Sequence, residues 1–433
     1  MCICIVGLGK IGLPLAVQSA SSGRDVIGVD ISRDVVDSVN SGISPFSGEL
    51  DLEKKLSEVV AKGLLKATTD ISAAVKNSSV IMVVVPLVVD QSSKPDFAII
   101  DDVTESIGSA LQKDTLVTYE TTLPVGTTRN RFTSKLVELS GLVLGKDLFV
   151  VHSPERVFSG RIFKDLRSYP KLVGGVDDAS LQKGVDFYTS ILEFDNRPEL
   201  SRPNGVWAMD SAEAAEFTKL AETTYRNVNI GLANEFAEFA EDQEIDIYQV
   251  IEASNSQPFS YIHQPGIAVG GHCIPVYPKF YLSTAPNSKI PLTAIEVNES
   301  VAERVVEKIR KRIGSLEGLR AVILGASYRG GVKEISFSGV YRISNALEKD
   351  GANVFVHDPL FENEELSHLG FEPYSFGETC DIAILQADHS QYLKITPEDM
   401  PGIKLMYDGR NFLDSDNWES VDFLKIGGFT ESK

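Results

Sequence analysis

The sequence predicts an α/β fold in which two doubly wound sheets are joined by a long central helix and a helical middle domain. Three observations lead to this fold. Short apolar segments alternate with amphipathic segments at both ends of the chain, which is the order expected of parallel strands covered by helices. A stretch rich in Ala, Glu and Leu and free of proline, residues 210–245, separates the two ends. The 433 residues are too many for a single ordinary core.

The N-terminal domain, residues 1–200, is predicted to be built on a sheet of parallel strands. The run VIMVVVPLVV at 80–89 is too short to span a bilayer and contains Pro86, so it is interpreted as a buried strand. A helix is expected to follow the first strand and to end near Ser21. The predicted strands are residues 2–7, 25–30, 80–85, 116–120 and 148–154.

The middle domain, residues 201–314, is predicted to be helical. Residues 210–245 are expected to form one helix of roughly 30 residues, well above the usual ~11–12. A helix of this length commonly serves as the spine between domains or as a dimer contact, so we expect a homodimer through it. Further helix is predicted through about Ala253 and at 291–314.

The C-terminal domain, residues 315–433, repeats the alternation of strands and helices. A helix is expected at about 339–350. The predicted strands are residues 319–328, 352–359, 380–387 and 404–409. This order again indicates a doubly wound sheet.

The composition excludes several classes of protein. Forty-one basic against sixty-one acidic residues give a formal charge of −20, which argues against nucleic acid as the main partner because phosphate binding needs a basic surface. Four cysteines without a CxxC or histidine-rich cluster indicate neither a disulfide framework nor a zinc site. The start MCICIVGLG lacks a basic segment and breaks at Gly7, so it is a poor signal peptide. These features predict a cytoplasmic protein with no membrane partner.

A glycine-rich turn follows the first predicted strand. In Gly7-Leu-Gly9-Lys-Ile-Gly12 the first glycine permits a tight turn, the second lets backbone approach a pyrophosphate and the third lets the helix pack on the strand. The helix N-terminus then offers N–H groups and a positive dipole end to phosphates. Asp30 ends the second strand, where a carboxylate accepts hydrogen bonds from ribose hydroxyls and repels a 2′-phosphate. The pattern predicts a Rossmann-like domain that binds NAD rather than NADP, with an ordinary glycine-rich turn as the alternative.

Eight distinctive motifs follow one another along the chain. They are VGLGKIGLPLA (6–16), YETTLPVGTTR (119–129), SPERVFSGR (153–161), AEFTKLAETTYRNVNIGLANE (215–235), GGHCIPV (270–276), LGASYRG (324–330), HDP (357–359) and DGRN (408–411). In these motifs and their order the chain resembles the UDP-glucose/UDP-N-acetylmannosamine dehydrogenase family, whose members are nucleotide-sugar 6-dehydrogenases. The family plan of an NAD domain, a central dimerisation helix and a UDP domain agrees with the predicted organisation.

The resemblance implies two successive oxidations of a UDP-sugar, from the C6 alcohol through an aldehyde to the uronic acid. The local stretch 265–278 leaves Cys273 open as a packing residue, a metal ligand or a nucleophile. The resemblance gives it the position of the nucleophile, which traps the aldehyde as a thiohemiacetal and carries it to a thioester. Only a thiolate attacks well and a free thiol has a pKa of ~8.5, so the site has to supply positive or dipolar help.

Further catalytic residues are implied by the same resemblance. Lys219 takes the position of an ammonium that stabilises a developing oxyanion, and a solvated helix charge is its alternative. Glu155 takes the position of a base for the water that cleaves the thioester, and a salt bridge to a neighbouring arginine is its alternative. Thr122 is expected to orient that water, while Thr121 beside it is equally well a turn residue.

Contacts with the two ligands are expected along the whole chain. Arg329, after Tyr328, and Arg410 are expected to bind the diphosphate because a guanidinium binds phosphate oxygens in pairs. Asn234 on the long helix faces either the substrate or solvent. The expected cofactor contacts are Gly7, Gly9, Lys10, Ile11, Gly12, Asp30, Pro86 and Thr122. The expected substrate contacts are Glu155, Arg156, Lys219, Asn234, Gly271, Arg329 and Arg410.

The chain departs from the family pattern at three positions. Thr223 stands where the family usually has asparagine, four residues after the lysine. Tyr277 stands where it usually has aspartate, four residues after the cysteine. Ser336 occupies the arginine position of the family's DxRxSP motif. The first two residues commonly act together on the water or the lysine, so their loss predicts a coupled change in how hydrolysis is handled.

The substrate is predicted from the residues around the catalytic positions. His272 beside the cysteine, and YRNVNI on the long helix, favour UDP-N-acetylmannosamine or another UDP-N-acetylhexosamine, with UDP-glucose as the alternative. A place in polysaccharide biosynthesis follows from such a substrate. Two other functions stay open: a two-electron hydroxyacid or 6-phosphogluconate-type dehydrogenase, and an NAD- or nucleotide-binding protein without turnover.

Overall fold

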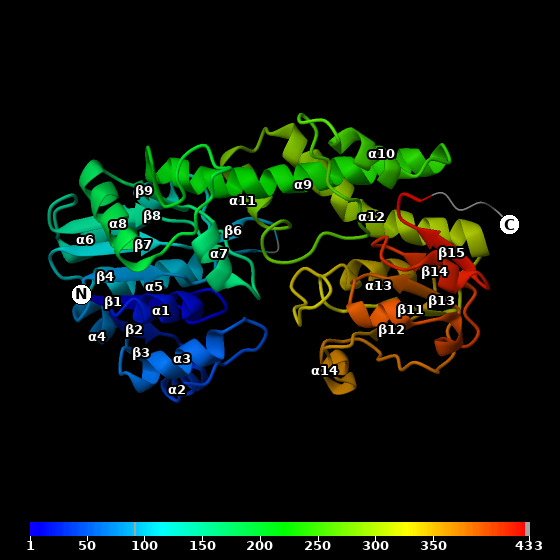
Figure 1. The fold of residues 1–433 in the computed structure, drawn as a ribbon, viewed down its shortest axis with the longest axis horizontal. Coiled ribbons are helices and arrows are strands. Elements are labelled where there is room, and N and C mark those ends of the chain that lie inside the picture. Colours follow the sequence, from blue (N-terminus) through cyan, green and yellow to red (C-terminus); the bar gives the residue numbers. More distant parts are fainter. Residues whose placement is uncertain (91, 429–433) are drawn as a thin grey trace. The chain divides into compact units, whose positions relative to one another are not determined.

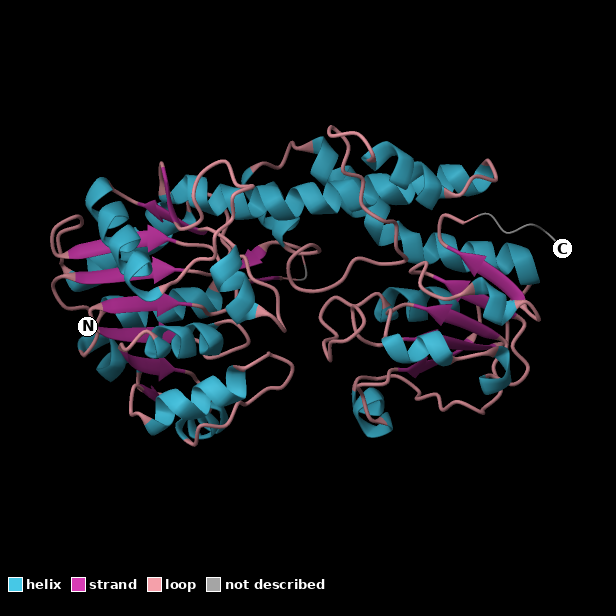
Figure 2. Cartoon of the chain, viewed as in Figure 1, coloured by secondary structure: helices cyan, strands magenta, loops and turns pink. Residues whose placement is uncertain are grey.

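The structure is a computed structural model that describes residues 1–90 and 92–428, and the chain forms two compact units. The first unit consists of Met1–Glu222 together with Lys279–Ala285. The second consists of Thr223–Pro278 together with the described chain from Pro286 onward. Each unit contains one main sheet with helices packed on it, as Figure 2 shows. The α/β class with two doubly wound sheets is therefore confirmed.

The sheet of the first unit has eight strands in the order β10-β9-β8-β7-β4-β1-β2-β3 (Figure 1). All neighbours pair in parallel except β8 and β9, which are antiparallel. The strands are β1 (Cys2–Val6), β2 (Asp25–Val29), β3 (Leu65–Thr68), β4 (Val80–Val83), β7 (Thr115–Tyr119), β8 (Leu148–His152), β9 (Lys171–Gly175) and β10 (Val206–Met209). A separate two-stranded ribbon pairs β5 (Val88–Val89) with β6 (Pro95–Asp96).

The order of the strands reverses between β1 and β4. From β1 the chain runs outward through β2 and β3, and it then returns to build β4, β7 and β8 on the other side. Such a reversal opens a crevice at the carboxyl ends of the two central strands, which is where doubly wound sheets bind ligands. The helices of this unit are α1 (Gly12–Ser21), α2 (Arg33–Asn40), α3 (Leu52–Ala61), α4 (Ile71–Lys76), α5 (Ala98–Gly108), η1 (Thr128–Thr133), α6 (Ser134–Ser140), α7 (Ile162–Ser168) and α8 (Asp178–Ile191).

The long helix predicted in the middle of the chain is present as α9 (Ala212–Asp242), with 31 residues. It begins two residues later than the predicted start because Ser211 caps it, accepting a hydrogen bond from the Ala214 N–H at 3.1 Å. The remaining helices of the middle region are α10 (Ile247–Asn255), α11 (Tyr277–Thr284) and α12 (Lys289–Ile313). In the part of the chain that the structure describes, no helix is long and apolar enough to cross a bilayer.

The sheet of the second unit is entirely parallel, in the order β12-β11-β13-β14-β15. Strand β11 is buried on both faces, since Ala321 and Ile323 belong to one apolar cluster and Val322 and Leu324 to another. The order reverses between β11 and β13, which again opens a crevice at their carboxyl ends. The elements are β11 (Arg320–Leu324), α13 (Val340–Lys349), β12 (Asn353–His357), α14 (Asn363–His368), β13 (Ile382–Leu385), η2 (Ser390–Lys394), η3 (Pro397–Asp399), β14 (Leu405–Asp408), η4 (Ser415–Trp418) and β15 (Asp422–Lys425).

Every strand predicted from the sequence is present, but the ribbon of β5 and β6 was not predicted, and neither were four strands at or near the edges of the two main sheets. These are β3, β9, β10 and β15. Each has only four or five residues, and Lys66 and Lys171 interrupt the apolar pattern of two of them. Their strand conformation comes from pairing with a neighbour rather than from local sequence.

Candidate active site

The glycine-rich turn after β1 lies at the switch point of the first sheet. A side chain on Gly12 would place its Cβ 1.8 Å from the carbonyl oxygen of Gly7, so helix α1 packs on the turn as closely as glycine allows. A Cβ on exposed Gly9 would meet no atom within 4 Å, which leaves open space beside this backbone for a phosphate. The Asp30 carboxylate accepts hydrogen bonds from the Leu8 and Ser32 N–H groups, both at 2.9 Å. These features fit a dinucleotide.

Substitution by alanine is expected to have different effects at Gly9 and at Gly12. Gly9→Ala is expected to leave the thermal unfolding midpoint unchanged but to weaken NAD binding about tenfold or more, because its methyl group enters the space left for phosphate. Gly12→Ala is expected to lower the unfolding midpoint as well, because its methyl group meets backbone. Calorimetric titration with NAD and a thermal melt measure both effects. Equal NAD affinity for Gly9→Ala and the wild type would contradict this placement of the pyrophosphate.

The loop after β7 carries the two threonines of the ETTLPVGTT motif. Thr121 donates its hydroxyl to the carbonyl of Val85 at 2.6 Å, which fixes the chain just before exposed Pro86. Thr121 thus acts as a loop anchor, in line with the alternative considered for it. Thr121 therefore lies beside the carboxyl end of β4, one of the two strands that flank the switch point. Thr122 is buried.

Glu216 on α9 holds this loop in place, a role that was not predicted. Its carboxylate accepts hydrogen bonds from the Gly126 and Thr128 N–H groups at 2.5 and 2.8 Å, and from the Thr128 hydroxyl at 2.7 Å. Burial raises the pKa of Glu216 to about 7 against the opposing effect of these hydrogen bonds. A signal was present in the sequence, because this glutamate lies in the same motif as Lys219, one helical turn before it.

Glu155 does not pair with either neighbouring arginine. Its Oε2 lies 2.8 Å from the ammonium of Lys171, the first residue of β9. Arg156 pairs instead with Glu222 at 2.5 Å, and Arg161 pairs with Asp165 at 3.1 Å. The alternative of a salt bridge within the SPER segment is therefore wrong, because the antiparallel return from β8 to β9 brings in a lysine sixteen residues away.

Lys219 lies on α9 with 9% of its surface exposed. A solvated helix charge, the alternative interpretation of this lysine, is therefore wrong. Thr223, one turn later on the helix, is also buried, with 4% exposed. The departure from the family's asparagine thus places a hydroxyl in a buried position, where the side chain has to satisfy its hydrogen bonds within the protein.

Cys273 is exposed, in contrast to Cys4 and Cys380, which are buried. A packing role for it is therefore excluded. The chain enters its turn through Gly271, whose φ of +84° disfavours any other residue and whose N–H donates to the carbonyl of Ser336 at 2.9 Å. The Cys273 carbonyl accepts from the N–H of Tyr277 at 2.9 Å, which closes a helical turn immediately before α11. The exposed thiol thus stands at the start of a helical turn.

Two predicted substrate contacts hold the cysteine loop in the second unit. The Asn234 side chain accepts from the Gly266 N–H and donates to Asn298, both at 2.9 Å, and it is buried rather than solvated. The Arg410 guanidinium donates to the Ala268 carbonyl at 3.1 Å and to the Gln386 carbonyl at 2.5 Å. Both side chains therefore bind protein groups on the loop that leads to Cys273.

Arg329 differs from Arg410 in its surroundings. It is exposed in the loop after β11, at the switch point of the second sheet, and its Nε donates to the Tyr328 hydroxyl at 3.1 Å. The Tyr328 side chain in turn fills the space that a side chain at Gly270 or Gly271 would need. The lack of side chains at Gly270 and Gly271 therefore leaves room for the Tyr328 side chain. Tyr328 links the cysteine loop to the loop that carries Arg329.

Ser336 replaces an arginine of the family pattern with a local contact. Its hydroxyl donates to the Glu334 carboxylate at 2.6 Å, while its carbonyl binds Gly271. His272 follows Gly271 in the chain, and its Nε2 lies 3.9 Å from the Glu334 carboxylate. The His272 side chain is largely exposed. The position therefore supports the cysteine turn through its backbone, a role that does not depend on the missing guanidinium.

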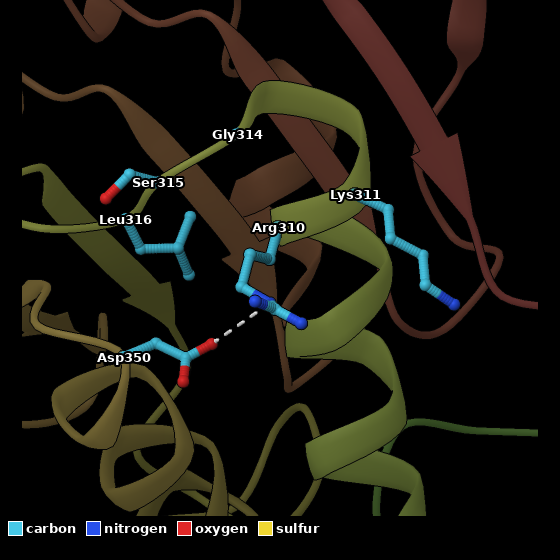
Figure 3. Close-up of a pocket in the computed structure, with 6 residues that line it drawn as sticks. All are labelled: Arg310, Lys311, Gly314, Ser315, Leu316 and Asp350. Carbon is cyan, nitrogen blue, oxygen red and sulfur yellow. Dashed lines mark ion pairs between the residues drawn. The ribbon is translucent and has the colours of Figure 1, made fainter.

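A hollow of about 530 Å³ lies elsewhere in the second unit, at the C-terminal end of α12. It is lined by Arg310, Lys311, Gly314, Ser315, Leu316 and Asp350. Figure 3 shows the ion pair of Arg310 and Asp350, which spans 3.8 Å, and Lys311 pointing away from it. None of the predicted site residues lines this hollow, so it is not part of the candidate active site.

A dinucleotide turn at the switch point of a doubly wound sheet is typical of NAD-dependent dehydrogenases. The chain matches three models of one family: the NAD binding domain at residues 1–192, the central domain at 213–304 and the UDP binding domain at 322–415. It belongs to the UDP-glucose/GDP-mannose dehydrogenase family. The predicted family, the enzyme class and the cofactor NAD are thereby confirmed.

Relatives with similar sequences and structures span nearly the whole chain. The UDP-N-acetyl-D-mannosamine dehydrogenases of Methanocaldococcus jannaschii and Pyrococcus horikoshii are each 33% identical, over 97% and 95% of this chain and 95% and 96% of theirs. The solved structure of the Pyrococcus horikoshii UDP-D-ManNAc dehydrogenase superposes with a TM-score of 0.87 at 30% identity, covering 99% of both chains. The chain is therefore an NAD-dependent UDP-sugar 6-dehydrogenase.

Proposed function

We propose that the chain oxidises UDP-N-acetylmannosamine at C6 to the uronic acid, with Cys273 as the nucleophile. The exposure of Cys273 in a turn opened by Gly271 is the observation that carries the covalent mechanism. The names of the relatives that match the full chain support the choice of sugar. UDP-glucose is the alternative substrate.

NAD, when bound, accepts a hydride in each of the two oxidations. Lys219, buried on α9, supplies the positive charge that stabilises the oxyanion of the sugar. The Cys273 thiolate adds to the aldehyde carbon, and its C–S bond persists through the second oxidation as a thioester. Glu155 then takes a proton from water as the water oxygen bonds to the thioester carbon. The C–S bond breaks, the thiolate is released, and the protons of Glu155 and of the new acid pass to solvent.

The ligand contacts follow the switch points of the two sheets. The cofactor is placed against the Gly7–Gly12 turn, Lys10, Ile11, Asp30, Pro86 and Thr122, and the sugar nucleotide against Arg156, Gly271 and Arg329. Asn234 and Arg410 act on the substrate through the cysteine loop that they hold. The corresponding domains are 1–200 for NAD, 201–314 for the middle and 315–433 for UDP, and the matched family models support this division.

A homodimer in the cytoplasm is the proposed form of the enzyme. Large apolar side chains are exposed along α9: Phe217, Tyr225, Leu232, Phe236 and Phe239. Their spacing of three, four, seven and eight residues corresponds to one face of a helix, and an exposed apolar face of this kind favours a protein partner. Replacing Phe239 with glutamate is expected to shift the mass measured by light scattering from dimer to monomer, whereas glutamate at exposed Val143 serves as the control.

A panel of UDP-sugars assayed for NADH tests the proposed function. Two NADH per UDP-N-acetylmannosamine are expected, and a higher kcat/KM for this sugar than for UDP-glucose. One NADH per sugar would instead support a two-electron dehydrogenase. Tight binding of NAD and a UDP-sugar without any NADH would support a binding protein that has lost turnover. Higher kcat/KM for UDP-glucose would overturn the substrate but keep the mechanism.

A further inference from the structure

A buried cation joins two carboxylates behind the proposed catalytic base. The Lys171 ammonium lies 2.6 Å from Oε2 of Glu120 and 2.8 Å from Oε2 of Glu155. The side chains of Lys171, Glu120 and Glu155 are 5%, 0% and 10% exposed. Three elements meet here, because Glu120 follows β7, Glu155 follows β8 and Lys171 opens β9. Ion pairs this deeply buried are costly to assemble, so the arrangement calls for a reason beyond stability.

The groups around this triad leave Glu155 as its outermost member. Tyr188 on α8 donates its hydroxyl to Oε1 of Glu120 at 2.5 Å and lies 2.8 Å from the Thr118 hydroxyl, so the inner carboxylate is fully engaged. His152 on β8 is buried, and burial together with Lys171 lowers its pKa to about 3, so it stays neutral. The Glu155 carboxylate is left with Lys171 and the Arg156 N–H, which donates to Oε1 at 2.9 Å.

Space beside the outer carboxylate is small. A cavity of about 10 Å³, the size that holds a single water, is lined by residues of the SPER segment and the start of β9. Its lining includes Glu155, Arg156 and Lys171, together with Asp165, whose charge is balanced by Arg161. Few solvent molecules are therefore present to hold Glu155 in its charged form, and the charge depends on the protein.

We propose that Lys171 is a positioning residue that keeps the Glu155 carboxylate ionised and oriented for the hydrolytic step. The proposal rests on the proposed function, in which Glu155 takes the proton of the attacking water. Lys171 does not touch the substrate in this scheme. It acts through Glu155, while Glu120 holds the lysine from behind and competes for its charge.

Burial and the neighbouring charges shift the pKa of each of the two carboxyl groups in a definite direction. Burial would raise the pKa of Glu155, but the Lys171 ammonium outweighs it and the pKa is lowered. Burial raises the pKa of Glu120 to about 7, with Lys171 opposing it. As pH falls, Glu120 is therefore protonated first, and Glu155 keeps the lysine to itself. Loss of the cation therefore raises the pKa of Glu155, whereas Glu120, already uncharged when Glu155 titrates, takes no charge away from the lysine in that pH range.

Two substitutions, one that removes the cation and one that removes the inner carboxylate, test this proposal. Lys171→Met is expected to move the acid limb of thioester hydrolysis up by about one to three pH units. At pH 7 the covalent adduct on Cys273 should then accumulate, and intact-protein mass spectrometry detects it. Glu120→Gln is expected to leave the same limb near its wild-type position, because Glu120 is already uncharged when Glu155 titrates, and Lys171→Arg is expected to restore the limb close to the wild type. The rates come from rapid mixing with the UDP-sugar that gives NADH in the panel, with NAD affinity as the measure of folding.

The outcomes separate this inference from the proposed function. If the wild type produces two NADH per sugar while Lys171→Met leaves the acid limb in place, the inference is wrong and the proposed function stands. If both variants shift the limb in the same direction, Lys171 is only structural. A wild type without turnover overturns both. Lys171→Gln is a second uncharged replacement that can still donate hydrogen bonds, and it should move the limb up as Lys171→Met does, so the proposal stays testable even if Lys171→Met does not fold.

Discussion

Replacing Cys273 with serine is expected to reduce the steady-state formation of NADH by on the order of a thousandfold or more. A serine hydroxyl stays protonated at neutral pH and adds poorly to an aldehyde, whereas a thiol ionises far more readily than a hydroxyl and its thiolate is a strong nucleophile. The substitution removes no buried contact because the side chain is exposed, so the unfolding midpoint should not change. A coupled measurement of NADH and of the covalent adduct by mass spectrometry gives both results.

Cys2→Ser provides the matched control, because Cys2 is the half-buried first residue of β1 and takes no part in the proposed chemistry. It should retain the wild-type rate and the adduct. Two complete oxidations by Cys273→Ser at the wild-type rate would exclude covalent catalysis by this residue, while the UDP-sugar 6-dehydrogenase activity itself would remain.

Lys219→Met is expected to lower kcat by about a hundredfold to a thousandfold, with little change in NAD affinity. Methionine matches the length of the buried lysine side chain but provides no charge for the oxyanion, so the loss falls on the transition state rather than on folding. Pre-steady-state measurement of the first NADH formed isolates this step from thioester hydrolysis.

The control for Lys219 is Lys113→Met, a lysine with 77% of its side chain exposed in a surface ion pair with Asp147. Surface pairs of this kind contribute little to stability, so neither kcat nor the unfolding midpoint should change. A kcat for Lys219→Met within a factor of about three of the wild type would remove the lysine from the chemistry, because one charge-stabilising donor is expected to contribute far more than that.

The two pairs of substitutions test different parts of the mechanism. Cys273→Ser blocks the covalent capture of the aldehyde, whereas Lys219→Met slows every step in which negative charge develops on the sugar oxygen. Lys171→Met is expected to leave both of these and to act on hydrolysis alone. If the three variants stall at three distinguishable steps of the reaction, the order of these steps is established.

Local patterns in the sequence predicted the parts of the molecule that depend on local geometry. The turn from Gly7 to Gly12 follows from steric needs within twelve residues, and α9 follows from an uninterrupted helical composition. The apolar runs of β1, β4, β11 and β13 are buried on both sides, so their pattern is continuous and easy to recognise. The motif around Cys273 likewise lies within fourteen consecutive residues.

The contacts that set the charge and position of the site residues were not predictable in this way. Glu155 was expected beside an arginine of its own segment, but the antiparallel pairing of β8 and β9 gives it Lys171 instead. Arg410 was expected on a phosphate, and its guanidinium binds the carbonyls of Gln386 and Ala268 in loops far away in the sequence.

The sequence by itself therefore determined the fold class and the cofactor turn, because each depends on residues that are close along the chain, and the family resemblance added Cys273 as the proposed nucleophile. Only the tertiary structure decided that Lys219 is buried, that Cys273 is exposed and that Glu155 shares a cation with Glu120. Burial and pairing are properties of the surroundings, which are assembled from strands and helices tens of residues apart. They fix the ionisation state of each side chain, and that state determines whether a lysine, cysteine or glutamate can act in the reaction.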